Sequence, residues 1–278
     1  MTGYDLWTRN RNKFKRLVDA GEPALAMWVN LPWQATPEIL GSCGCDAALI
    51  DMEHTTSSIH DVFNMIIACA AAGITPFYRP SAMDTANVAR ALDSGAQGII
   101  FPNINTRDEA ERAVASCRLP PQGNRPWAGA HTRQAVWNGI PAAAALREPD
   151  PRLRGVHSAE YVDMMNNEVL VVLMIESPEG VANLDAILDV PGIHSVRFGW
   201  ADYSIHVGFD LDKCQQAADF TYETCRAKGV GYSFTLGQAG QHPHYPGCWY
   251  GVGLDTLLFA GALRDAVAAA RERVGRTG

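Results

Sequence analysis

The sequence predicts an α/β fold, a (β/α)₈ TIM barrel in which residues 1–278 form one domain. Three observations favour this fold. Eight short apolar segments are spaced along the chain, segments with helical periodicity lie between most of them, and the length of 278 residues is close to the roughly 250 that such barrels take. A doubly wound parallel sheet is the competing arrangement, but the number of strands favours a closed barrel.

The eight apolar segments are predicted to be parallel strands. Most of them are apolar almost throughout, as expected when both faces of a strand are covered by other layers. They are Ala24–Asn30, Ala47–Met52, Ile74–Arg79, Gly98–Pro102, Val169–Ile175, Val196–Gly199, Gly231–Leu236 and Thr256–Phe259.

The helical segments carry start signals of their own. Thr36-Pro37-Glu38 predicts a helix start, with a capping residue before a proline at the first helical position. Asp84–Asp93 begins with an aspartate and keeps apolar residues on one face. Thr106–Cys117 begins with a capping threonine and has an acidic first turn, which suits the helix dipole. We also expect an N-terminal helix around Phe14 and a last helix over Leu263–Val274.

One irregular stretch, residues 119–158, interrupts the alternation of strands and helices. It contains six of the sixteen prolines, beginning with Pro120-Pro121. An excursion of this length inside a compact domain is usually functional or disordered. We therefore expect an extended loop or insertion here.

The composition excludes several classes of protein. Acidic residues outnumber basic ones, 30 to 23, which argues against a nucleic-acid surface. No apolar run reaches the length of about 18 residues expected of a membrane span, and the N-terminus lacks the order of a signal peptide. Seven scattered cysteines without a C-x-x-C pair are typical of reduced thiols rather than of a zinc site. We expect a cytoplasmic protein without nucleic-acid or membrane partners.

Titratable side chains follow four of the predicted strands at their C-terminal ends. The second strand ends in Asp51-Met52-Glu53-His54, the third in Arg79-Pro80, the fifth in Glu176-Ser177-Pro178 and the sixth in Gly199-Trp200-Ala201-Asp202. In a (β/α)₈ barrel these ends surround the active site. One such residue alone more often caps a helix, but four ends with complementary chemistry predict a catalytic site.

Glu176 and Asp202 are the predicted metal ligands. They follow consecutive strands, which are neighbours in a barrel. Two carboxylates without clustered thiols suit Mg²⁺ or Mn²⁺, with water in the remaining positions. Taken singly, each carboxylate is better explained as an N-cap or first-turn charge of the following helix.

Arg79 and His54 are the other candidates for chemistry. Arg79 keeps its charge and is placed to meet an anionic substrate, although an internal salt bridge to Asp51 explains it equally well. His54 titrates near neutral pH and follows two carboxylates, and Asp93 is a candidate to orient it. A lone histidine is more often structural than catalytic.

The lysines exclude one mechanism. The chain has four lysines, Lys13, Lys15, Lys213 and Lys228, and none lies on a predicted strand. A Schiff-base mechanism therefore has no obvious nucleophile.

With these segments in place, the sequence resembles the HpcH/HpaI aldolases, the class II pyruvate aldolases of the phosphoenolpyruvate/pyruvate barrel superfamily. The matching segments occur in the family's order from about Ala24 to the last helix. They are Leu49–His54, Tyr78-Arg79-Pro80, Leu92–Ala96, Pro120–Arg125, Ile175-Glu176-Ser177, Gly199–Asp202 and Gly253–Thr256.

The resemblance implies a divalent-metal-dependent carbon–carbon lyase. Glu176 and Asp202 would ligate the metal, for which Co²⁺ is a third candidate. The metal would chelate a pyruvate-type 2-keto acid, Arg79 would bind its keto or enolate oxygen, and an aldehyde would be the second substrate. His54 would transfer protons, supported by Asp93 and Asp51. Relatives form hexamers built as dimers of trimers, so a homo-oligomer, hexamer or trimer, is expected.

The resemblance also places Met174, Trp200 and Ala201 with Arg79 at the substrate. Met174 stands where relatives usually carry a glutamine, and Trp200 replaces the usual proline beside a metal ligand. Residues 142–158 have the character of an insertion. These departures suggest a bulkier and more apolar pocket. They leave open a decarboxylase or synthase acting on a specialised metabolite, and a non-catalytic binding barrel is a third alternative.

Overall fold

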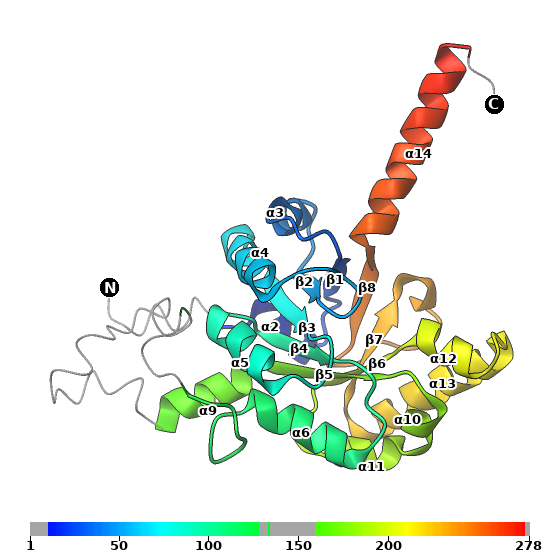
Figure 1. Ribbon diagram of the computed structural model, residues 1–278. Coiled ribbons are helices and arrows are strands. Elements are labelled where there is room, and N and C mark those ends of the chain that lie inside the picture. The colour runs from blue at the N-terminus through cyan, green and yellow to red at the C-terminus, as the bar shows by residue number, and fades with distance from the viewer. Residues whose placement is uncertain (1–10, 128–132, 134–158, 276–278) are drawn as a thin grey trace, which may run out of the picture.

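The computed structural model describes residues 11–127, residue 133 and residues 159–275, and its core is a closed barrel of eight parallel strands. The strands pair in sequence order, and β8 pairs with β1 to complete the circle (Figure 1). This confirms the predicted fold class. The strands are β1 (Leu25–Val29), β2 (Ala47–Asp51), β3 (Thr75–Arg79), β4 (Gly98–Phe101), β5 (Leu170–Ile175), β6 (Ser195–Phe198), β7 (Gly231–Thr235) and β8 (Trp249–Leu254).

Helices alternate with the strands and form the outer layer. Those on the first half of the barrel are α2 (Lys13–Asp19), α3 (Ala35–Ser42), α4 (Ile59–Ala72), α5 (Thr85–Ser94) and α6 (Arg107–Cys117). The second half carries α9 (Ala159–Glu168), α10 (Pro178–Ala182), α11 (Leu184–Leu188), α12 (Trp200–His206), α13 (Leu211–Lys228), the short 3₁₀ helix η3 (Leu236–Gln238) and α14 (Asp255–Arg273).

The predicted helix caps are formed at two of three places. Asp84 accepts hydrogen bonds from two backbone amides at the start of α5, and Thr106 forms a capping box with Glu109 at the start of α6. The prediction at Thr36 is wrong, because α3 begins at Ala35 and Thr36 lies inside its first turn. Pro37 fits there because the first helical amides need no intrahelical acceptor.

The last strand and helix also differ from the prediction. The eighth strand is β8 at Trp249–Leu254, whereas the predicted strand Thr256–Phe259 forms the start of α14. A four-residue apolar run fits either a strand or one helical turn, so periodicity does not decide between them. Gly251 and Gly253 weaken the strand signal of β8 itself.

The core consists of an inner and an outer layer of side chains. Alternate residues of each strand point into the barrel, and the others pack against the helices. Helix α2 covers the N-terminal end of the barrel, where the Phe14 ring meets Phe77 edge-on at 5.1 Å and Trp249 at 5.8 Å. Phe14 is fully buried. This end is therefore closed, and the C-terminal strand ends form the mouth.

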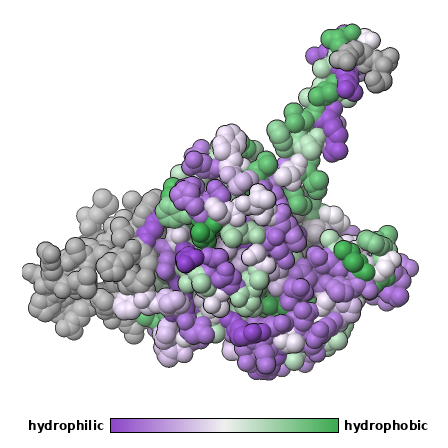
Figure 2. Space-filling view, in the orientation of Figure 1, coloured by the Kyte–Doolittle hydropathy of each residue, from purple (hydrophilic) through white to green (hydrophobic). Residues whose placement is uncertain are grey.

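Helix α14 leaves the outer layer and extends away from the barrel (Figure 1). Its first residue is held by the barrel, because the Asp255 carboxylate accepts hydrogen bonds from the backbone amides of Asn30 and Leu31 at 3.0–3.1 Å. Beyond it, Leu257, Phe259 and other apolar side chains of the helix are exposed (Figure 2). Within the described part of the chain, no helix is both long enough and apolar enough to cross a membrane.

The contact between α2 and the barrel floor generates a stability prediction. Phe14→Ala should lower the free energy of unfolding by about 3–5 kcal/mol, because it removes a fully buried ring from a site that cannot collapse completely. Phe220→Ala on α13 is the control, since that ring is 52% exposed. Denaturant unfolding of the two variants measures the difference. Equal stabilities would show that α2 does not close the barrel floor.

Candidate active site

A buried ion pair joins β2 and β3 at the mouth of the barrel. Asp51 and Arg79 are register partners, and Arg79 Nε and Nη2 donate to the two carboxylate oxygens of Asp51, each at 2.8 Å. Asp51 has no exposed surface and also accepts from the Glu53 amide at 2.9 Å and from Asn30 Nδ2 at 3.2 Å. Asp51 therefore fixes the guanidinium plane of Arg79.

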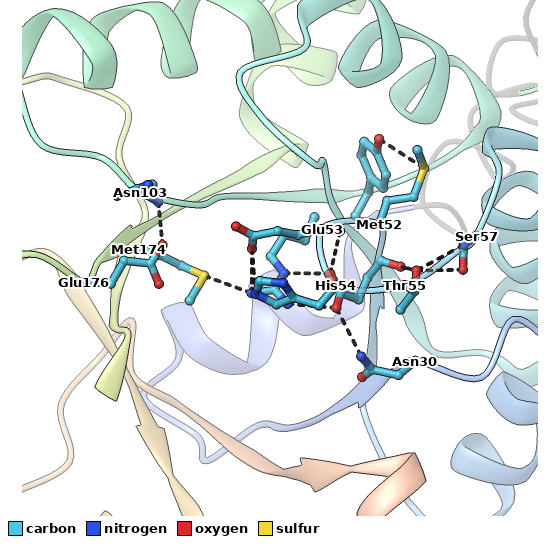
Figure 3. A network of polar contacts seen from close by, with 12 residues as sticks. Asn30, Met52, Glu53, His54, Thr55, Ser57, Asn103, Met174 and Glu176 are labelled. Carbon is cyan, nitrogen blue, oxygen red and sulfur yellow. Dashed lines mark hydrogen bonds and ion pairs between the residues drawn. The ribbon is translucent and has the colours of Figure 1, made fainter. Parts of the chain in front are cut away.

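Glu53 forms an ion pair with the third guanidinium nitrogen of Arg79, Nη1. Its Oε2 atom lies 2.9 Å from Arg79 Nη1 and 3.6 Å from His54 Nε2 (Figure 3). Burial raises the pKa of Glu53. The positive charges of Arg79 and His54 act to lower this pKa, and the carboxylates of Asp51 and Asp202 act to raise it. We assigned Glu53 no role from the sequence, although it stands inside the segment Asp51-Met52-Glu53-His54.

His54 lies at the rim of the mouth, and its side chain is 57% exposed. Its nearest acidic neighbour is Glu53 rather than the expected Asp93. Asp93 instead forms an ion pair with Arg125, with Asp93 Oδ1 2.7 Å from Arg125 Nη2. The structure therefore brings His54 together with Asp51, Glu53 and Arg79, and gives Asp93 a different partner.

Glu176 is held at the end of β5 by two backbone features. The amide of Asn103, which follows β4, donates to Glu176 Oε1 at 2.6 Å. On the other side, a β-carbon at Gly199 would approach Glu176 Oε2 to 2.3 Å, so only glycine leaves room for this carboxylate. Ser177, rather than Glu176, caps α10, which removes the capping explanation for Glu176.

Glu176 is buried among like charges. Its pKa is raised from the ordinary 4.5 to about 7, mainly by burial and also by the carboxylates of Asp202 and Glu53, against the Asn103 amide and Arg79. Asp202 is exposed in the first turn of α12. Three carboxylates thus influence one another at a single mouth, as the order of the strand ends predicts.

The three substrate-binding candidates other than Arg79 lie in different surroundings. Met174 points into the barrel and its sulfur lies 3.6 Å from Arg79 Nη1. The ring of Trp200 packs edge-on against Phe198 at 6.1 Å, in the layer between barrel and helices. Ala201 is exposed next to Asp202. Met174 therefore meets the site directly, whereas part of the Trp200 ring belongs to the outer core.

Arg197 and Trp28 complete the inner wall, and we did not identify them from the sequence. The Arg79 guanidinium lies 4.2 Å from the centre of the Trp28 ring, and that of Arg197 lies 5.5 Å from it. Arg197 Nη1 also donates to Ser233 Oγ at 2.7 Å. A lone arginine inside the apolar segment Ser195–Phe198 was the available signal, because a charge on the inner face of a strand is costly.

No group of three or more histidine, cysteine or acidic side chains with metal-binding geometry occurs among the described residues. The predicted metal ligands, Glu176 and Asp202, are two side chains and therefore do not reach this number. A site of this kind needs water or substrate for its remaining ligands, as is common for Mg²⁺. Residues 142–158, the predicted insertion, lie outside the described residues.

The raised pKa of Glu176 predicts how stability depends on pH. In chelator-treated protein, the folded state holds this proton up to about pH 7, whereas the unfolded carboxyl loses it near 4.5. The stabilisation by this proton is therefore complete below pH 4.5 and is lost as the pH rises through 7. Glu176→Gln removes the titration, so its stability relative to wild type should increase over this range by up to about 3 kcal/mol. Denaturant unfolding at pH 5 and 8 tests this, and a constant difference would contradict it.

Comparison with known proteins agrees with this geometry. The family model described as HpcH/HpaI aldolase/citrate lyase matches residues 24–245. The 4-hydroxy-2-oxo-heptane-1,7-dioate aldolase of Salmonella typhimurium is 32% identical over 257 residues, which cover 90% of this chain and 91% of the relative.

Solved structures give the same result. An HpcH/HpaI aldolase/citrate lyase family protein from Burkholderia cenocepacia superposes with a TM-score of 0.79 at 27% identity, covering 94% of this chain and 99% of its own. Macrophomate synthase, at 22% identity, shares the fold with a TM-score of 0.77 over 98% of this chain and 91% of its own. The chain therefore belongs to the HpcH/HpaI aldolase/citrate lyase family and is an enzyme of the aldolase and carbon–carbon lyase class.

Proposed function

We propose that this enzyme makes or cleaves a carbon–carbon bond through the enolate of a pyruvate-type 2-keto acid, with an aldehyde as the second substrate. The observation that carries the proposal is the buried Glu176 carboxylate, which shares one mouth with Asp202 and with the oriented guanidinium of Arg79. The name of the Salmonella relative, a 4-hydroxy-2-oxo-heptane-1,7-dioate aldolase, supports it.

The charges at the mouth fit a divalent cation. Four carboxylates, Asp51, Glu53, Glu176 and Asp202, face the guanidinium groups of Arg79 and Arg197. When Glu176 is ionised, the excess of two negative charges equals the charge of one Mg²⁺, Mn²⁺ or Co²⁺ ion, and carboxylate oxygens are hard donors that suit Mg²⁺ and Mn²⁺. Glu176 and Asp202 would hold the ion, because they lack the ion pairs that Asp51 and Glu53 make with Arg79. When bound, the metal would stabilise negative charge on the 2-keto acid as a Lewis acid.

Arg79 is the residue we assign to the keto oxygen. Asp51 holds its Nε and Nη2 atoms, so the guanidinium is oriented before substrate arrives. Nη1, which is paired with Glu53, also points toward the sulfur of Met174, on the strand that leads into Glu176. A fixed donor at the oxygen that becomes an enolate stabilises the negative charge as it develops, and such stabilisation is usually the largest single contribution to catalysis.

His54 is the residue we assign to proton transfer. Removal of one proton from the methyl carbon of pyruvate gives the enolate, whose carbon then bonds to the aldehyde carbon, and the aldehyde oxygen takes up a proton. The two proton transfers cancel in the overall addition. Glu53, 3.6 Å from His54 Nε2, takes the orienting part expected of Asp93. The reverse sequence cleaves the same bond.

Proton exchange in the half-reaction tests the proposal. With Mg²⁺ or Mn²⁺, the methyl protons of pyruvate should exchange with deuterated water, as followed by NMR. Glu176→Ala should lower this rate by about 100-fold or more, since charge stabilisation at the enolate is lost. The matched control is Glu179→Ala, an exposed carboxylate on the following helix. Exchange that persists with a chelator or in Glu176→Ala would contradict a metal at this carboxylate.

We further propose that the protein is a cytoplasmic homo-oligomer, a trimer or hexamer, in which α14 packs on a second copy. Helix α14 contacts its own barrel mainly through β1 and β8 and then presents exposed apolar side chains. These are Leu257, Leu258, Phe259, Leu263 and Val267, which are 48–63% exposed. An apolar stripe of this extent is typical of an interface.

Charged substitutions on α14 test the oligomer. Leu258→Lys combined with Leu263→Lys should lower the molar mass in size-exclusion chromatography with light scattering, because lysine resists burial in an apolar interface. Phe220→Lys, on an exposed position of α13, is the control and should leave the mass unchanged. A wild-type protein that is monomeric at micromolar concentration would refute the proposal.

A further inference from the structure

A cavity of about 270 Å³ lies at the N-terminal end of the barrel, at the opposite end from the mouth. Its walls come from α2, from the C-terminal ends of α6 and α9, and from the segments that begin β5 and precede β6. Sites for drug-sized ligands take roughly 300–1,000 Å³, so this cavity suits a smaller molecule. None of the residues of the candidate active site lines it.

Within the described part of the chain, no acidic residue lines this cavity. The basic side chains on its walls are Lys15, Arg118 and His194, and the amide side chains are Gln122, Asn166 and Asn167. The whole chain carries a formal net charge of -7, so walls without a carboxylate are unusual for this protein. The cavity therefore offers N–H donors and positive charge to a ligand.

Arg118 is held in a fixed position on its wall. Its Nη1 atom donates to the carbonyl oxygen of Val169 at 3.1 Å, and its Nη2 atom donates to that of Gly192 at 3.2 Å. The backbone beside it is also fixed, because the Leu119 amide donates to Asn166 Oδ1 at 2.7 Å. The guanidinium is therefore oriented before a ligand arrives, which favours tight binding.

The charge of Arg118 has no carboxylate partner among the residues that the structure describes. The two carbonyl oxygens are neutral acceptors, and they use only some of the N–H donors of a guanidinium. Burial lowers the pKa of Arg118, and the neighbouring charge of Arg125 acts in the same direction. A partly buried charge is normally paired, so an anion in the cavity would supply the missing partner.

Lys15 and His194 share one counter-ion. The Asp19 carboxylate forms ion pairs with Lys15 Nζ and, at 3.2 Å, with His194 Nε2. The hydrogen bonds from His194 and Lys15 lower the pKa of Asp19 to about 2, against its burial. The single negative charge of Asp19 offsets only one positive charge. With Arg118 unpaired, the cavity keeps an excess of positive charge, which grows when His194 is protonated.

We propose that this cavity binds a phosphate group, either free phosphate or the phosphate of a small ester. A phosphate group carries a charge of about −1.5 to −2 near neutral pH and has three strong acceptor oxygens. Lys15, Arg118 and His194 stand on three different segments, so their donors reach the cavity from separate walls. This arrangement suits tetrahedral phosphate better than a flat carboxylate. The site does not depend on the proposed aldol chemistry, since it lies at the other end of the barrel.

Calorimetric titration with inorganic phosphate tests the site. Metal-free protein at constant ionic strength excludes binding to a divalent ion and changes in screening. Wild type should bind one phosphate per chain with a millimolar or lower Kd. Arg118→Met should raise this Kd by about 10-fold or more, because hydrogen bonds to a charged group are lost. Asp19→Asn should lower it, because a competing negative charge is removed.

Arg107→Met is the matched control. It removes the same charge from α6 at a side chain that is 48% exposed, and it should leave the Kd unchanged. If Arg118→Met does not fold, Lys15→Met takes its place with the same expected increase. Absence of saturable binding in wild type would overturn the proposal. An unchanged Kd in Arg118→Met and Lys15→Met would also overturn it, because the phosphate would then lie elsewhere.

Glycerol 3-phosphate separates the two sources of the phosphate group. A lower Kd for this ester than for inorganic phosphate would assign the cavity to an organic phosphate, and the reverse order would assign it to the free ion. Each bound ligand should raise the midpoint of thermal unfolding in wild type, because it binds only the folded state. A rise of equal size in Arg118→Met would place the ligand outside the cavity and contradict the proposal.

Discussion

The ion pair between Asp51 and Arg79 is the interaction on which the mouth of the barrel depends. Both groups are buried, and the two parallel hydrogen bonds at 2.8 Å compensate for their removal from water. Removal of either partner would leave an uncompensated charge inside the barrel. The pair also sets what surrounds it, because the Asp51 carboxylate fixes the Glu53 amide and thereby the loop that carries His54.

The N-terminal end of the barrel contributes to stability, and the C-terminal end carries the residues of the candidate active site. At the N-terminal end, Phe14, Phe77 and Trp249 form a fully buried aromatic cluster beneath α2. At the C-terminal end, the inner side chains become charged within one or two residues of the strand ends. Burial, and then the neighbouring carboxylates, disfavour the charged form of Glu176, as its raised pKa indicates. The fold can accommodate these buried charges, because the apolar packing that stabilises it lies at the N-terminal end of the barrel.

The sequence was sufficient for the barrel and for the strand ends that form its mouth, since strand order in a (β/α)₈ barrel converts chain position into spatial position. It was insufficient where the deciding information is not local. The apolar run at Thr256–Phe259 fits two kinds of element, and the barrel is closed by the glycine-containing β8 instead. The carboxylate that lies beside His54 could not be identified from the sequence either. Asp93 and Glu53 both carry a carboxylate, and only the fold pairs Asp93 with Arg125 and leaves Glu53 beside His54.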